Sequence, residues 1–98
     1  MNTYNKFKKE INMTYTEFLN WSKTDCSKKA SLDRRPIKRL LRLLSTPKDK
    51  WTNNDITEAN KVISYLSRAK KIKSSNIICN GYTKNEIALK NWGYDVKK

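Results

Sequence analysis

The chain has 98 residues, with 22 Lys and Arg against 9 Asp and Glu, so its formal charge is +13. It contains no histidine, and this charge therefore stays constant near neutral pH. The length fits one domain with one modest core, and 37% hydrophobic residues argue against wholesale disorder. With only two glycines and two prolines, the chain is poor in the tight turns that a β-sandwich or barrel needs. We therefore expect a single basic helical domain over residues 1–98 of the all-α class.

Three six-residue segments share the pattern of a helix start: hydrophobic residue, threonine, two spacers, acid, hydrophobic residue. They are residues 13–18, 51–56 and 82–87. In such a capping box the threonine hydroxyl accepts the backbone N–H three residues on, while the acid accepts the N–H of the threonine. The acid also lies at the positive end of the helix dipole. Each segment therefore predicts the beginning of a helix.

The first predicted elements are short. Apolar residues at spacings of three and four indicate a leading helix within residues 1–12, with residues 1–3 frayed. A capped helix follows from Thr14 to about Lys23, and then a polar loop over residues 24–31. Pro36 suits the first turn of the next helix, and Pro47 lies just beyond its end.

The central helix is predicted over about residues 53–72, with four to five short helices forming a compact bundle around it. Residues 76–81 indicate a buried connector with a sharp turn, because Thr83 already begins the last helix and leaves no partner strand. That helix covers residues 84–92 and ends at Gly93, a left-handed terminator. Residues 94–98 are expected to be a frayed tail.

The first candidate nucleic-acid site is a cluster of arginines, because four of the five arginines fall between residues 34 and 42. Leucines occupy one arc of the helical wheel there, and the cations occupy the opposite arc. Guanidinium forks suit phosphate and the edge of guanine. The candidate residues are Arg34, Arg35, Lys38, Arg39, Arg42, Lys48 and Lys50. The alternative is a solvated helix face.

A second basic strip lies on the exposed arc of the central helix and contains Lys61, Arg68, Lys71 and Lys73. If both strips share one side of the domain, they form a continuous path for a DNA or RNA backbone. Replacing Arg35, Arg39 and Arg42 with glutamine is then expected to lower affinity at least about tenfold without unfolding the domain. The long connection between the two helices fits a helix-turn-helix poorly, so we expect phosphate contacts with little sequence readout.

Most aromatic residues are expected to belong to the core, because they lie at helix starts or on inward faces. Tyr4 and Tyr94 are the exceptions, since each lies near a basic end of the chain and could stack on unpaired bases.

Other classes of function receive less support. Without histidine, a glycine-rich phosphate loop or clustered carboxylates, we expect no enzyme, cofactor, metal site or small-molecule substrate. The sequence shows neither a leader nor 18 consecutive apolar residues, which predicts a cytoplasmic protein without membrane contact. Cys26 and Cys79 are interpreted as idle thiols rather than a disulfide. The alternative function is a small phage or mobile-element effector that binds and inhibits a host protein or ribonucleoprotein.

Overall fold

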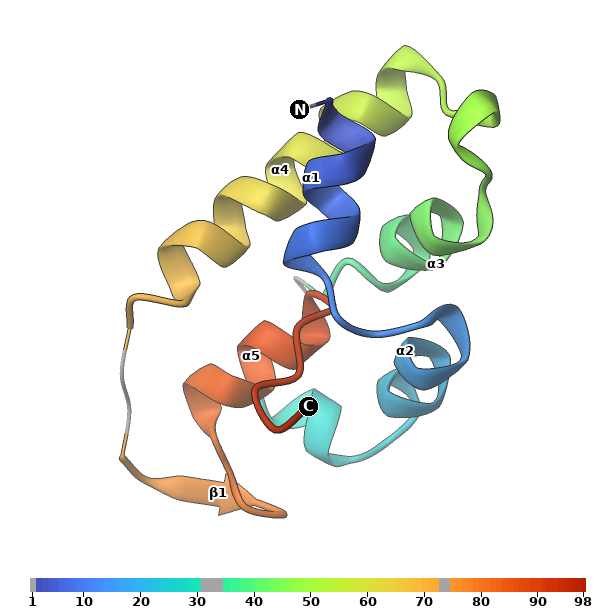
Figure 1. The fold of residues 1–98 in the computed structure, drawn as a ribbon. Helices are drawn as coiled ribbons and strands as arrows, with labels where there is room; N and C mark the ends of the chain where they lie inside the picture. The colour runs from blue at the N-terminus through green and yellow to red at the C-terminus, as the bar shows by residue number, and fades with distance from the viewer. Residues whose placement is uncertain (1, 31–34, 73–74) are drawn as a thin grey trace.

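The computed structural model describes residues 2–30, 35–72 and 75–98 (Figure 1). The described chain is mostly helical, and the 17-residue α4 is its longest element. In order, the elements are α1 (Thr3–Glu10), α2 (Tyr15–Ser22), η1 (Cys26–Lys29), α3 (Ile37–Ser45), η3 (Lys48–Lys50), α4 (Asn53–Ala69), β1 (Ile77–Cys79), β2 (Tyr82–Thr83) and α5 (Lys84–Asn91).

The three predicted helix starts are confirmed. In each, the threonine hydroxyl accepts the N–H of the acid at 3.2 Å, and the acid accepts the N–H of the threonine at 2.8–2.9 Å. The three pairs are Thr14 with Glu17, Thr52 with Asp55, and Thr83 with Glu86. α1 is capped differently, because the Asn2 side chain accepts the N–H of Asn5 at 2.8 Å. Local sequence therefore determines where α2, α4 and α5 begin.

Every α-helix contributes a fully buried large side chain to one core. These side chains are Phe7, Phe18, Leu40, Leu66 and Ile87, from α1 to α5 in order. α1 runs alongside α4, and α2, α3 and α5 pack around the other side of the core (Figure 1). Because burial of apolar surface drives folding, this shared core fixes the helices relative to one another.

One buried polar residue connects three elements at the base of the core. The Asn91 side chain accepts the indole N–H of Trp21 at 2.9 Å and donates to the carbonyls of Ser27 at 2.8 Å and Ala30 at 2.9 Å. Its polar atoms are thereby satisfied, as burial requires. This interaction joins α2, η1 and the end of α5.

The prediction of a buried connector over residues 76–81 is wrong, and the fold is therefore not strictly all-α. β1 and β2 form a small antiparallel hairpin, and β1 is exposed, with Ile77 at 62%. Asn80 and Gly81 both adopt positive φ (49° and 83°), the geometry of a tight two-residue hairpin turn. Thr83 can end β2 and also cap α5, because a helix N-cap residue has extended backbone angles.

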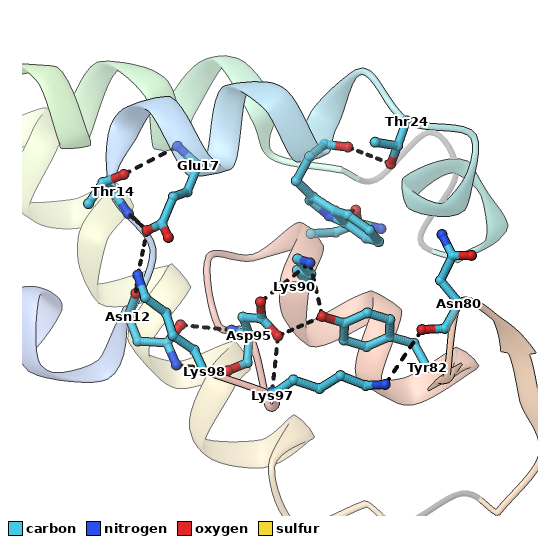
Figure 2. A network of polar contacts seen from close by, with 12 residues as sticks. Asn12, Thr14, Glu17, Thr24, Asn80, Tyr82, Lys90, Asp95, Lys97 and Lys98 are labelled. Atoms are coloured by element: carbon cyan, nitrogen blue, oxygen red, sulfur yellow. Dashed lines mark hydrogen bonds and ion pairs between the residues drawn. The ribbon is translucent and has the colours of Figure 1, made fainter.

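The C-terminal segment also differs from the frayed tail that the sequence predicts (Figure 2). The Asp95 N–H donates to Asn12 Oδ1 at 2.8 Å, and the Asp95 carboxylate accepts the Tyr82 hydroxyl at 2.8 Å. The Lys98 ammonium contacts Glu17. These contacts fasten residues 94–98 to α2 and β2, and they depend on partners up to 83 residues away, which no local pattern reveals.

The expectation of idle thiols is wrong as well. Cys26 and Cys79 form a disulfide, with a Cα–Cα distance of 5.8 Å, that joins η1 to β1. β1 buries none of its residues fully, so the covalent bond supplies an attachment that side-chain packing does not.

We expect this disulfide to stabilise the domain, because it closes a loop with a sequence separation of 53. Reduction should lower the free energy of unfolding by about 2–4 kcal/mol, the typical range for loops of this kind. Urea denaturation with and without reductant measures the effect. A variant with Cys26→Ser and Cys79→Ser should have the same free energy of unfolding as the reduced wild type, and adding reductant should not change it. Equal stability of the oxidised and reduced wild type would contradict the expectation.

Candidate nucleic-acid interface

The arginines of α3 connect this helix to α4. Arg42 Nε donates to Asp55 Oδ1 at 2.7 Å, and Nη2 donates to Oδ2 at 3.0 Å. This is a bidentate pair, the strongest geometry for guanidinium and carboxylate. Asp55 is buried, and its Oδ2 also accepts the Thr52 N–H in the capping box of α4. One carboxylate therefore caps α4 and connects it to α3.

The neighbouring arginines are also engaged within the chain. Arg39 forms an ion pair with Glu58 of α4. Arg35 Nη1 donates to the Ser27 hydroxyl at 2.9 Å and, at 3.4 Å, to the carbonyl of Ser22. The predicted wholly cationic face is therefore wrong for these three arginines, because α4 and the segment from Ser22 to Ser27 supply acceptors that the wheel of α3 alone does not show. Arg34 and Lys73 lie outside the described residues.

The carboxylate of Asp55 is charged throughout the neutral range. Hydrogen bonds from Arg42 and then from the Thr52 N–H lower the pKa of Asp55 from its ordinary value of 3.8 to about 2, against the opposing effect of burial. The same interaction raises the pKa of Arg42. Removal of Arg42 would leave a buried charge without its main partner. The expectation that glutamine at positions 35, 39 and 42 leaves the fold intact is therefore not supported, because one of the three arginines holds α3 against α4.

A cavity of about 300 Å³ between α3 and α4 has mixed charge. Its walls include Lys38, Arg39 and Arg42 from α3, and its α4 side includes Asp55 and Glu58. Lys38 is exposed and has no ion-pair partner among the described residues. Arg42 keeps a side chain that is 56% exposed despite its pair. These two cations remain accessible to a ligand from this side.

A second basic surface lies on α4 itself. Thr57, Asn60, Lys61, Ser64 and Arg68 line an open groove of about 420 Å³, which we call the α4 groove. Their spacing of three or four residues places them on one face of the helix. Lys71 lies just beyond the end of α4 and is exposed.

The cations of the α4 groove are more accessible than the arginines of α3. Lys61 lies 3.4 Å from Glu58 and keeps a side chain that is 60% exposed. Within the part of the chain that the structure describes, neither Arg68 nor Lys71 has a carboxylate partner. Because exposed ion pairs are weak, Lys61 is also available to an anion.

The two predicted basic strips meet at one carboxylate. Glu58 pairs with both Arg39 and Lys61, so the exposed cations of α3 and the α4 groove are neighbours. Lys48 and Lys50 lie apart from this junction on η3, both exposed. Lys48 instead lines a separate pocket with Tyr4 and Trp51, an arrangement that the sequence pattern did not reveal.

A second polar cluster involves Tyr82, Lys90 and Asp95 (Figure 2). Lys90 Nζ donates to the Tyr82 hydroxyl at 3.0 Å and lies 3.3 Å from Asp95 Oδ2. Burial raises the pKa of Tyr82, so the phenol stays neutral at physiological pH. Burial opposes ionisation of Asp95 too, but the Lys97 N–H, the Tyr82 hydroxyl and Lys90 lower its pKa overall. These groups satisfy one another and secure the C-terminal segment.

Comparisons with protein-family models, with curated proteins and with solved structures find no match for this chain. Among the described residues, no cluster of three or more acidic, cysteine or histidine side chains could hold a metal ion. No helix in the described ranges is long and apolar enough to cross a bilayer. The interpretation of function therefore depends on the surface itself.

The low pKa of Asp55 predicts a specific acid sensitivity. A depressed folded-state pKa adds stability above the unfolded pKa, and that stability is lost as pH falls through about 2. Wild type should therefore have a larger free energy of unfolding than Asp55→Asn at about pH 5. This difference between the two proteins should decrease as the pH falls toward about 2. Urea titrations of both proteins across this range measure the gap. The pKa of Glu17 is also lowered to about 2, but both proteins contain Glu17, so its contribution cancels in the difference between their free energies of unfolding. A gap that stays constant with pH would contradict the assignment.

Proposed function

We propose that the protein binds nucleic acid through its phosphate backbone, with the α4 groove as the main contact surface. The observation that supports this is the alignment of Lys61 and Arg68 on one exposed face of α4, beside hydroxyl and amide side chains, with the exposed Lys71 just beyond the end of the helix. Phosphate oxygens are bound in this way by cations together with Ser, Thr and Asn. A net charge of +13 draws a polyanion toward the surface.

The polar side chains of the α4 groove can supply neutral donors. Asn60 Oδ1 accepts the Thr3 hydroxyl at 3.4 Å, which leaves the amide N–H groups of Asn60 for a ligand. Ser64 is exposed, and its hydroxyl has no hydrogen bond to another described residue. Thr57 donates its hydroxyl to the Asn53 carbonyl at 3.1 Å and can still accept. Asn60 and Ser64 therefore supplement the cations with hydrogen bonds that carry no sequence information.

The size of the surface sets the number of contacts. Lys61 and Arg68 are separated by about 10 Å along the helix axis, roughly three times the axial rise per nucleotide of one strand in a B-form duplex. Lys38 and the exposed part of Arg42 extend the surface across Glu58. About four or five phosphate contacts give a log–log salt slope of roughly −4 on a duplex and roughly −3 on a single strand. Arg35 and Arg39 are left out of this count because they are engaged within the chain.

The test removes three charges from the proposed surface and, as a control, three from another. Lys61→Gln, Arg68→Gln and Lys71→Gln together should lower affinity for a labelled oligonucleotide at least about tenfold and flatten the salt slope by about two to three. The matched control replaces the exposed Lys23, Lys28 and Lys29 near η1 with glutamine. Fluorescence anisotropy at several salt concentrations measures both variants.

The control variant should keep a salt slope close to that of wild type, because its lysines lie outside the proposed surface. Equal weakening of the two variants would show attraction by net charge alone and overturn the assignment to α4. If wild type does not bind any oligonucleotide at low salt, the nucleic-acid proposal is wrong. The alternative of a protein partner with an acidic surface would then take its place.

A further inference from the structure

A pocket lined by aromatic rings lies where α1 meets the beginning of α4. It encloses about 370 Å³ and is lined by Asn2, Thr3, Tyr4, Lys48, Trp51 and Ile56. Ligand sites begin at about 300 Å³ and combine apolar walls with a few polar groups. We call it the Tyr4 pocket.

The apolar walls of the Tyr4 pocket are rigid and partly exposed. The Tyr4 and Trp51 rings meet edge to face with centroids 5.0 Å apart, and Trp51 packs in the same way on the buried Phe7 at 5.4 Å. The Trp51 indole N–H donates to the Thr46 carbonyl at 3.1 Å, which fixes the orientation of the ring. Ile56 adds an aliphatic wall that is 38% exposed. Because the rings meet edge to face, the pocket has no single flat wall, but the face of one ring can stack on a planar ligand.

The polar groups of the Tyr4 pocket suit an anionic ligand with hydrogen-bonding edges. Lys48 Nζ lies 5.8 Å from the centre of the Tyr4 ring, near the outer limit of a cation–π contact. The lysine thus covers the ring loosely, and its flexible chain can move to admit a flat group. Asn2 uses its side-chain oxygen to cap α1, which leaves its amide N–H groups as donors.

The Tyr4 pocket opens beside the α4 groove. Ile56 lines the pocket and Thr57, the next residue, lines the groove. Thr3 of the pocket also hydrogen-bonds to Asn60 of the groove at 3.4 Å. A ligand that follows the exposed face of α4 toward its N-terminal end therefore reaches the rings directly.

We propose that the Tyr4 pocket binds an unpaired nucleobase of a single strand whose phosphates follow the α4 groove. This inference rests on the proposed function and adds the ligand class, single-stranded rather than duplex nucleic acid. Stacking of a base on an aromatic side chain tolerates any sequence, since every base has a π-face. In a duplex the bases are paired and stacked within the helix, so no base face is free to stack on the rings of the pocket.

The test compares a single-stranded oligonucleotide with an abasic oligomer that has the same sugar–phosphate backbone and length. Wild type should bind the base-containing strand about tenfold more tightly, the order expected for one stacked base. Tyr4→Leu should abolish most of this difference and leave affinity for the abasic oligomer unchanged. Tyr15→Leu is the matched control, because Tyr15 is an exposed tyrosine on α2, outside the pocket. Circular dichroism melting of each variant verifies that it is folded.

The outcomes separate this inference from the proposed function. If wild type binds the two oligomers equally well, or if Tyr4→Leu weakens both to the same extent, the nucleobase site is wrong while backbone binding stands. If wild type binds neither oligomer, the proposed function is wrong, and the nucleobase site falls with it. Should Tyr4→Leu not fold, Lys48→Gln with Ile56→Ser probes the same pocket without changing a ring, and it must reduce the preference for the base-containing strand.

Discussion

The bidentate pair between Arg42 and Asp55 is the interaction on which the arrangement of the surface depends. Asp55 is buried, and the same carboxylate accepts the N–H of Thr52 at the first turn of α4. Because α4 begins at this point and α3 is tied to it, the pair determines how the two helices lie against each other. The junction of the basic strips at Glu58 and the α4 groove beyond it follow from that geometry.

The structure divides the cations into two groups by chemistry. Arg39 and Arg42 of α3 pair with carboxylates of α4, and Arg35, just before α3, donates to the Ser27 hydroxyl and the Ser22 carbonyl. Most lysines lie in solvent, as their compact, strongly hydrated ammonium groups favour. Arg68 is the exception, since it is exposed on the α4 groove. The cations available to a ligand are therefore mainly lysines, joined by Arg68 and the exposed part of Arg42.

The sequence predicts those features of the fold that depend on local interactions. The capping boxes and the apolar periodicity locate α2, α4 and α5, because their hydrogen bonds connect residues three or four apart. The hairpin does not follow from the sequence pattern, because Thr83 is the last residue of β2 as well as the cap of α5. Its extended backbone angles suit both positions. The Cys26–Cys79 bond and the Asn12–Asp95 contact join distant residues, which no spacing rule identifies. The disulfide also counts against the expected cytoplasmic location, which stays a prediction.

The same limit applies to the candidate site. The spacing of Lys61 and Arg68 on one helix can be read from the sequence, whereas the partners of Arg39 and Arg42 come from a different helix. A helical wheel shows which residues share a face but not what that face contacts. The most direct measurement is an NMR titration of isotope-labelled protein with a short single-stranded oligonucleotide. We expect chemical-shift changes along the exposed face of α4 and at Tyr4. The Arg42 Nε–H signal should not shift, because its hydrogen bond to Asp55 stays intact. Shift changes centred on α3, with loss of the Arg42–Asp55 pair, would contradict it.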